Sequence, residues 1–498
     1  MFKIIFTVIT FFFAQWAVAK ERPDIKRPEP TPPNIIYFLV DNLGVGEINS
    51  FAGGPLRGAE TKRIDGFAAE GIRLLNFAPE TQCTPSRSAL MTGRYSIRSG
   101  THTIPLPGDS GHGGGLVKWE RTIADILSDA GYATSIVGKW HIGVQSGRLP
   151  TDKGFDEWIG VPNSYADALW AEDPWYDPAN IPGTPITNVV ESKKGQEGFD
   201  NIEQLTMEVR RTIDLRYLER SKDFIDRSIG AGKPFYLYFN HSLMHLPVQP
   251  RDEFHGHTGH GPWADSLAQL DADFGQLLDH LETRGVADNT IVVFSGDNGP
   301  EEMQGDRGHA GYWQGSYFTG TEGSLRTPAA VRYPGVVPAG QVSNEIVHIT
   351  DMFTTLVEWV GADIPADRVI DGVDQRKFFQ GESGSSFRDG FPYWMGDKLY
   401  GVKWRNFKVV SVLREKFTDP VQELAVPYII NLDADPAERG PYNYPHIHSW
   451  VGSHAARILT DFKNSVAQEP LIPSGAPLDF IPKHAGENLL GSRCEKIN

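Results

Sequence analysis

The sequence predicts an α/β fold in which helices flank a large, mostly parallel sheet and a smaller subdomain with an antiparallel sheet follows at the C-terminus. Three features predict this fold. Apolar runs of strand length alternate with longer segments of helical periodicity, which is the order of a parallel sheet with crossover helices. The runs are mainly apolar, without strict alternation, as in strands that are buried on both faces. After about residue 381, short alternating strands replace this order.

The main sheet is predicted from four apolar runs and the helical segments between them. The runs span residues 34–40, 132–137, 234–239 and 290–294, and the helical segments span 121–129, 202–229 and 263–282. Ligands of such sheets bind beyond the carboxyl ends of the strands. Polar residues that directly follow a run are therefore the first candidates for a functional site.

A change of pattern divides the chain into a catalytic domain at residues 34–380 and a C-terminal subdomain at 381–498. The segment 381–386 is rich in Gly and Ser, which is typical of a loop. Short strands are expected within 399–413 and 426–432, and a helix within 449–463.

The N-terminus has the pattern of a secretory signal peptide at residues 1–19. An apolar run at 4–13 is followed by Ala17-Val18-Ala19, a typical cleavage site. A membrane anchor is the alternative, but the run is shorter than the roughly 20 residues that a spanning helix needs. Residues 20–33 are rich in proline and are expected to form an extended leader. We therefore expect an exported protein, periplasmic or secreted, with no stable membrane span.

The net charge limits the possible binding partners, and the cysteine content limits the possible disulfides. The 498-residue chain has 47 Lys and Arg against 63 Asp and Glu, a formal net charge of −16. No global positive field is available to bind nucleic acid. The chain has only two cysteines, Cys83 and Cys494. A disulfide between them is the simplest interpretation for an exported protein, but the surroundings of Cys83 favour a chemical role.

The segment from Cys83 to Arg94 combines a nucleophile with an anion-binding helix end. Pro85 suits the first turn of a helix and Gly93 suits its end. Cys83 then lies at the helix N-terminus, where free backbone N–H groups favour an anion. Arg87, four residues later, shares its face. This arrangement suits transfer of a sulfuryl or phosphoryl group.

The same segment, Cys-x-Pro-Ser-Arg followed by Thr-Gly-Arg, resembles the signature of the type I, formylglycine-dependent sulfatases. The resemblance implies an arylsulfatase-like enzyme with the fold of the alkaline phosphatase superfamily. It also implies that a formylglycine-generating maturation enzyme oxidises Cys83 to an aldehyde, whose hydrate attacks the sulfur of a sulfate ester. Cys83 would then not pair with Cys494. Arg87 would hold the sulfate.

Two acid–amide pairs are the predicted cation ligands. Asp41-Asn42 follows the run 34–40, and Asp297-Asn298 follows the run 290–294. Their hard oxygen atoms suit Ca²⁺, or alternatively Mg²⁺. The family has its cation at matching positions, with the formylglycine oxygen from Cys83 as a further ligand. Many relatives have Asp-Asp at the first pair, so this site is expected to have one negative charge fewer.

Lys139 and His141 follow the run 132–137. In an extended segment they would lie on the same face. The sequence from Gly138 to Gly143 resembles the second signature of the sulfatases. The resemblance gives Lys139 a sulfate-binding role, and it makes His141 the base that regenerates the aldehyde.

Two further residues are predicted to bind the sulfate group. His245 precedes Pro247 in a His-x-Pro element that the family has after the corresponding strand. It is expected to bind the sulfate or the leaving group, with His241 as the competing choice. Ser164 matches a family serine that can donate a hydrogen bond to the sulfate, although a loop serine is more often structural.

One departure from the family pattern concerns a lysine. Many members have a lysine shortly before a Glu-Gly-Gly-x-Arg-x-Pro element, which appears here at residues 322–328. Counting back without gaps places Tyr317 at the lysine position, and residues 298–328 contain no lysine. Arg307 or His309 is the candidate replacement, and His309 is assigned as a substrate-binding residue.

The predicted substrate is a sulfated small molecule or glycan. Trp170, Trp175 and Tyr176 lie in a long loop where they can stack on a ring or pack the loop. Three alternatives stay open. The same scaffold can hydrolyse phosphate or phosphonate esters, because fold does not determine substrate. An unmodified Cys83 would leave a sulfated-glycan binder without turnover, or a thiol hydrolase.

Overall fold

The computed structural model describes residues 32–105, 114–176, 187–302, 308–440 and 447–483. The predicted signal peptide and almost all of the leader lie outside these residues, as do Arg307 and Cys494. The domain boundary near residue 380 and the cleavage after residue 19 stay predictions. Among the described residues, none of the helices combines the length and the apolar character needed to cross a membrane.

Within the described residues, eleven strands form the main sheet, in the order β10-β2-β9-β8-β1-β7-β3-β4-β5-β6, with β11 paired to β2. Their bounds are β1 Asn34–Val40, β2 Ile72–Ala78, β3 Ala133–Val137, β4 Glu157–Gly160, β5 Asn188–Lys193, β6 Asp200–Gln204, β7 Phe235–His241, β8 Thr290–Gly296, β9 Thr327–Arg332, β10 Gln341–Ser343 and β11 Val347–His348.

The centre of the sheet is parallel. Strand β1 lies between β7 and β8 and is parallel to both, and β3 is parallel to β7 and β4. Strand β9 is antiparallel to its neighbours β2 and β8, and β5 and β6 form an antiparallel edge. The predicted mostly parallel sheet is therefore confirmed.

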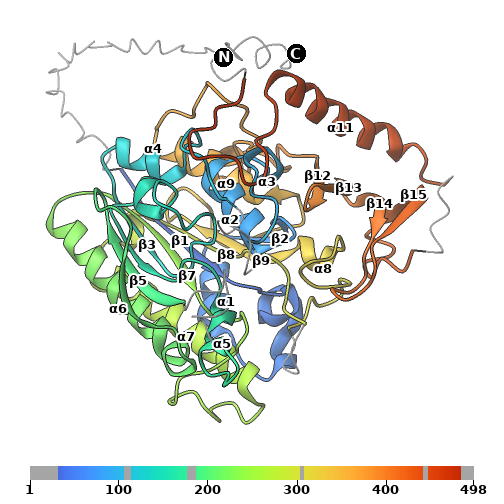
Figure 1. The fold of residues 1–498 in the computed structure, drawn as a ribbon. Coiled ribbons are helices and arrows are strands. Elements are labelled where there is room, and N and C mark those ends of the chain that lie inside the picture. Colours follow the sequence, from blue (N-terminus) through green and yellow to red (C-terminus); the bar gives the residue numbers. More distant parts are fainter. Residues whose placement is uncertain (1–31, 106–113, 177–186, 303–307, 441–446, 484–498) are drawn as a thin grey trace, which may run out of the picture. The chain divides into compact units, whose positions relative to one another are not determined.

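Helices cover both faces of this sheet (Figure 1). The helix bounds are α1 Lys62–Ala69, α2 Cys83–Thr92, α3 Ser96–Ser99, α4 Ile123–Asp129, α5 Ala168–Ala171, α6 Met207–Gly230, α7 Pro262–Thr283, α8 Glu322–Leu325, α9 Ile349–Trp359, α10 Arg376–Phe379 and α11 Val451–Gln468. Helices α1, α6 and α7 share one hydrophobic cluster with alternate residues of β1, such as Phe38. Helices α2, α4 and α9 pack with the other residues of β1, such as Tyr37.

One predicted element differs from the structure. The pattern of segment 202–229 predicts a helix throughout, but its first residues belong to β6, and α6 begins at Met207. Strand β6 pairs with β5, so the edge of the sheet determines the conformation there and overrides local preference.

The C-terminal part forms the predicted antiparallel sheet. Its strands are β12 Gly390–Met395, β13 Lys398–Trp404, β14 Phe407–Leu413 and β15 Gln422–Asn431, hydrogen-bonded in that order. Helix α11 packs on this sheet, with Phe462 against Trp394 at a ring-centroid distance of 4.8 Å. In Figure 1 these elements, coloured orange to red, lie beside α8 and the end of the main sheet that carries β2.

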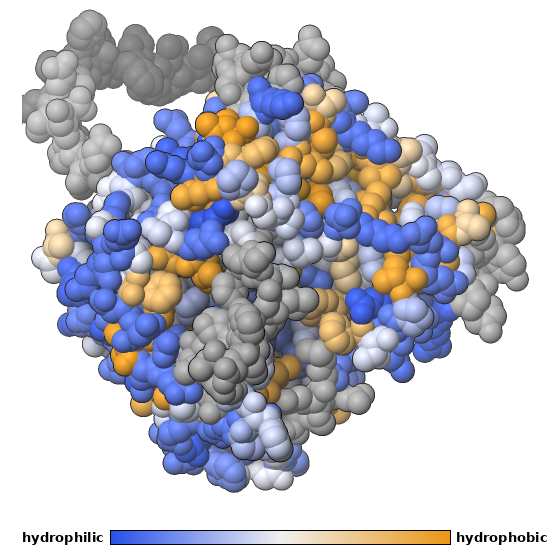
Figure 2. Space-filling view, viewed as in Figure 1, coloured by the Kyte–Doolittle hydropathy of each residue, from blue (hydrophilic) through white to orange (hydrophobic). Residues whose placement is uncertain are grey.

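The surface seen in Figure 2 is mainly hydrophilic on the side where α6 lies. Most exposed side chains of α6 are polar, such as Glu219, Asp223 and Arg227, and Arg227 forms an ion pair with Asp223 at 2.8 Å. This polar face agrees with a helix that packs on the sheet with its apolar side only.

Candidate active site

The cation-ligand candidates meet at the carboxyl ends of two neighbouring strands. Val40, the last residue of β1, is in register with Gly296, the last of β8. Asp41 and Asn42 therefore lie beside Asp297 and Asn298, and all four are 0% exposed. The backbone N–H of Asn42, in the left-handed conformation with φ 62°, donates to Asp297 Oδ1 at 3.1 Å.

Cys83 lies at the N-terminus of α2 and faces these residues. Its Sγ is 3.4 Å from Asp41 Oδ1 and 3.7 Å from Asn42 Oδ1. Gly93, with φ 68°, ends α2 as predicted. Burial, and next the charge of Asp41, raise the pKa of the Cys83 thiol well above its ordinary value.

Two buried cations accompany the carboxylates. Arg87 Nη2 lies 2.9 Å from Asp297 Oδ2 and 3.4 Å from Asp41 Oδ2, and Lys139 Nζ lies 2.8 Å from Asp41 Oδ2. Burial opposes ionisation of Asp41, but the charges of Lys139, His245 and Arg87 hold its pKa well below its usual range. Burial, together with the charge of Asp41, raises the pKa of Asp297 to about 7. Opposite charges are thus concentrated around Cys83.

His141 lies in the same group, but not for the predicted reason. The segment after β3 is not extended, because Gly138 has φ 100° and His141 has φ 64°. Simple strand alternation therefore does not describe this segment, although Lys139 and His141 both lie near Cys83. Burial, and next the charges of Lys139 and Arg87, lower the pKa of His141 well below its ordinary value. Its Nδ1 is buried and makes no hydrogen bond to the described residues.

His245 and His241 point to different surroundings. Ligand atoms of His245, Asp41 and Cys83 lie within 4.8 Å of one another. Burial lowers the pKa of His245 to about 4, and its Nδ1 lies 2.6 Å from the carbonyl oxygen of Leu246. His241 instead contacts Asp273 at 3.1 Å, under the sheet. His245 therefore belongs to the cluster around Cys83, whereas His241 lies outside it.

Ser164 and His309 are held by local contacts. Ser164 Oγ accepts a hydrogen bond from the N–H of Ala166 and caps a short helical turn. His309 is exposed, and its Nδ1 accepts a hydrogen bond from the N–H of Gly311. No contact of either side chain with Cys83 occurs among the described residues, so their substrate-binding roles stay predictions.

The donor set fits a hard divalent cation. Carboxylate and amide oxygens from Asp41, Asn42, Asp297 and Asn298 converge near Cys83, which is the chemistry that Ca²⁺ and Mg²⁺ prefer. Asn298 Oδ1 is buried without a hydrogen-bond partner among the described residues. A buried acceptor of this kind costs free energy unless a ligand satisfies it. The residues present therefore fit the predicted divalent cation.

Sequence reasoning missed two buried polar residues of this region. Asn240 Oδ1 accepts a hydrogen bond of 2.8 Å from Arg87 Nη1. It lies near the carboxyl end of β7, which is the signal that could have found it. Glu301 Oε2 accepts one of 3.3 Å from Asn42 Nδ2. It lies three residues after Asn298, without a motif of its own.

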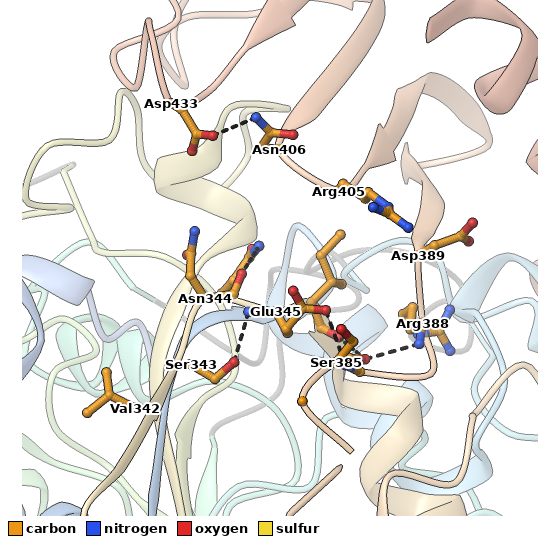
Figure 3. Close-up of a pocket in the computed structure, with 14 residues that line it drawn as sticks. Val342, Ser343, Asn344, Glu345, Ser385, Arg388, Asp389, Arg405, Asn406 and Asp433 are labelled. Atoms are coloured by element: carbon orange, nitrogen blue, oxygen red, sulfur yellow. Dashed lines mark hydrogen bonds between the residues drawn. The ribbon is translucent and has the colours of Figure 1, made fainter. Parts of the chain in front are cut away.

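A separate cavity of about 490 Å³ lies between the end of the main sheet at β10 and the C-terminal sheet (Figure 3). Its lining includes Arg388, which is ion-paired with Asp351, and Asp389, which is ion-paired with Arg457. None of the residues around Cys83 lines it. The cavity is therefore separate from the Cys83 cluster, which holds the predicted nucleophile and cation ligands.

Comparisons with known proteins agree with this geometry. The family model "Sulfatase" matches residues 33–362, and the model "N-sulphoglucosamine sulphohydrolase, C-terminal" matches residues 308–449. N-acetylgalactosamine-6-sulfatase of Canis lupus familiaris is 32% identical over 94% of this chain and 92% of its own length. Arylsulfatase A of Bos taurus is 32% identical over 82% of this chain and 83% of its own.

A solved structure shows the same fold. The PsFucS1 sulfatase from Pseudoalteromonas sp. superposes with a TM-score of 0.81 at 28% identity, over 89% of this chain and 92% of that chain. The family model covers more than half of the chain, and the relatives span nearly all of it. The chain therefore belongs to the sulfatase family of the alkaline phosphatase superfamily, and it is a sulfatase.

Proposed function

We propose that this sulfatase releases inorganic sulfate from a sulfated carbohydrate or aryl sulfate, with formylglycine made from Cys83 and a bound Ca²⁺ or Mg²⁺. The observation that supports this most directly is the position of Cys83. It starts α2 and faces Asp41 and Asn42 at 3.4 and 3.7 Å, in a fully buried cluster with Arg87 and Lys139.

The hydrated aldehyde would supply a nucleophilic hydroxyl, and the cation would act as a Lewis acid on the sulfate oxygens. Asp41, Asn42, Asp297 and Asn298 would hold the cation. Arg87 and Lys139 are fixed positive charges that offset the negative charge developing on the sulfate group. Both are held by carboxylates before substrate arrives, so little reorganisation is needed at the moment of reaction.

The two histidines are suited to move protons. His141 stays neutral at ordinary pH because burial depresses its pKa, and its Nδ1 is free to accept a proton from the nucleophile position. His245 Nδ1 contacts the carbonyl oxygen of Leu246. This contact turns Nε2 towards the Asp41 and Cys83 side, where it can contact the sulfate or the leaving oxygen.

A sulfated sugar is the favoured substrate class. The relative named N-acetylgalactosamine-6-sulfatase supports it. The side chain of Trp175 is 89% exposed and can stack on a sugar ring, whereas Trp170 and Tyr176 pack against each other at 6.1 Å.

The test is the mass of the peptide around Cys83, in protein from a host that installs formylglycine, together with an aryl sulfate assay. We expect conversion of Cys83, loss of activity with a chelator, and at least about 1,000-fold loss in Cys83→Ala. A paired aryl phosphate assay separates the phosphate-ester alternative. Native protein in which Cys83 stays a thiol would overturn the proposal and favour a binding protein.

A further inference from the structure

A buried carboxylate lies directly behind one of the cation-ligand candidates. Glu301 is 0% exposed, and its Oε2 accepts a hydrogen bond from Asn42 Nδ2 at 3.3 Å. On the other side of the same amide, Asn42 Oδ1 faces Cys83 Sγ at 3.7 Å and accepts from Asn298 Nδ2 at 2.7 Å. The Asn42 amide is thus held at both ends.

The orientation of this amide decides whether it can bind a cation. An asparagine side chain has nearly the same shape after a 180° flip, which exchanges its oxygen and its NH₂ group. Only the oxygen can ligate a cation, and the NH₂ group would repel one. A carboxylate accepts hydrogen bonds and cannot donate them, so Glu301 selects the flip in which the NH₂ group points away from Cys83.

Glu301 is itself held in place by Tyr317. The Tyr317 side chain is 3% exposed and is hydrogen-bonded to Glu301. The N–H of Tyr317 donates to the carbonyl oxygen of Pro300 at 3.3 Å, and the N–H of the next residue, Phe318, donates to that of Thr81 at 3.2 Å. The segment is therefore tied both to the loop after β8 and to the residues just before Cys83.

We propose that Glu301, held by Tyr317, is a positioning residue that turns the Asn42 amide oxygen towards the cation site. The inference rests on the proposed assignment of that site. Asn42 and Tyr317 both contact the carboxylate of Glu301.

Glu301 also places a negative charge near the cation site. An amide ligand brings no negative charge, but a carboxylate hydrogen-bonded to its NH₂ group polarises it and makes its oxygen a better donor. Removal of such an outer contact typically lowers metal affinity about 10–100-fold.

The test is Ca²⁺ titration calorimetry on the full mature chain, with kcat and KM for an aryl sulfate measured in parallel. In Glu301→Gln, the new NH₂ group competes with that of Asn42, and we expect Ca²⁺ affinity to fall at least about 10-fold. The loss of kcat should be recovered by added Ca²⁺. Tyr317→Phe, which removes one donor to Glu301, should lower the affinity about threefold.

The decisive variant is Asn42→Asp combined with Glu301→Gln. A carboxylate at position 42 offers an oxygen in either orientation, and it accepts a hydrogen bond from the NH₂ group that the second substitution introduces. Ca²⁺ affinity should therefore return to within about threefold of the wild type. The control Glu302→Gln makes the same charge change one residue later and should leave the affinity unchanged.

Either of two results overturns the positioning role: a folded Glu301→Gln protein with wild-type Ca²⁺ affinity, or a double variant no better than the single one. These two results concern only the positioning role of Glu301, and they can be distinguished from a failure of the proposed sulfatase function. A wild-type protein whose Ca²⁺ affinity falls in Glu301→Gln, but which releases no sulfate, would reject the function and support the positioning role.

Discussion

The side chain of Lys139 shows how much depends on a single buried charge. Its Nζ lies 2.8 Å from Asp41 Oδ2, and both side chains are 0% exposed. Lys139→Met keeps most of the volume but removes a positive charge that can offset the sulfate group. We expect kcat/KM for an aryl sulfate to fall about 100–1,000-fold. In the control Lys194→Met, an exposed lysine paired with Asp156 at 3.7 Å is removed, and activity should stay unchanged.

A loss below about threefold in Lys139→Met would show that this lysine only balances the charge of Asp41. The sulfate-binding role would then have to move to Arg87, whose guanidinium also contacts Asp41 and Asp297.

Glu47 predicts a pH dependence of stability. Burial raises its pKa to about 8 from an ordinary 4.5, although Gly44 N–H and Trp263 Nε1–H donate to it at 3.1 and 2.7 Å. Between these values the folded state binds more protons than the unfolded state. The free energy of unfolding should therefore fall as pH rises through this window, by at most about 1.4 kcal/mol per pH unit.

Urea unfolding of the wild type and Glu47→Gln at several pH values between about 5 and 8 checks this expectation. The variant loses one acceptor, so it should be the less stable protein at the acidic end, by about 1 kcal/mol. Its disadvantage should shrink or reverse towards pH 8. A constant difference across the range would contradict the raised pKa.

At the scale of elements, the end of α2 depends on a glycine. Gly93 has φ 68°, and a Cβ there would lie 2.4 Å from Phe353 Cδ1. Gly93→Ala should therefore lower the free energy of unfolding by about 2 kcal/mol or more. The control is Gly66→Ala in α1, where nothing lies within 4 Å of the added Cβ. It should raise stability by about 0.5–1 kcal/mol. Equal effects of the two variants in thermal unfolding would contradict this account.

The buried strands were predictable because their apolar runs are continuous. The run 34–40 is β1 itself, and the other three runs fall within a few residues of β3, β7 and β8. The edge strand β6, with the sequence DNIEQ, carries no such signal, because pairing with β5 determines its conformation. The local hydrophobic pattern identifies strands that are buried in the sheet. It does not identify an exposed edge strand, whose conformation depends on hydrogen bonds to its neighbour.

The active-site residues divide in a similar way. Cys83 and the pairs 41–42 and 297–298 were found because each follows a strand or starts a helix. Glu301 was not found, because its contact with Asn42 depends on the path of a loop after β8. Lys139 and His141 both lie in the cluster, although Gly138 and His141 are left-handed and the segment is not a simple continuation of β3.

At the scale of the whole molecule, a buried charge network joins the two sheets. Lys403 on β13 lies 2.6 Å from Glu322 on α8, and both side chains are 0% exposed. Glu322 also accepts from Arg326 at 2.7 Å, and Lys403 donates to Asn76 Oδ1 on β2 at 2.7 Å. These contacts connect the C-terminal sheet to the main sheet through α8 and Arg326.

Lys403→Met should destabilise the protein by about 1–3 kcal/mol, because Asn76 Oδ1 and Glu322 Oε2 each lose a buried donor, while Glu322 keeps its contact with Arg326. The control Lys398→Met lies on the same strand and removes an exposed ion pair with Glu423. It should cost less than about 1 kcal/mol. Urea unfolding followed by tryptophan fluorescence measures both. Comparable losses in the two variants would mean that apolar packing, such as Phe391 and Tyr393 in the shared cluster with Leu325, holds the two sheets together without help from the ion pair.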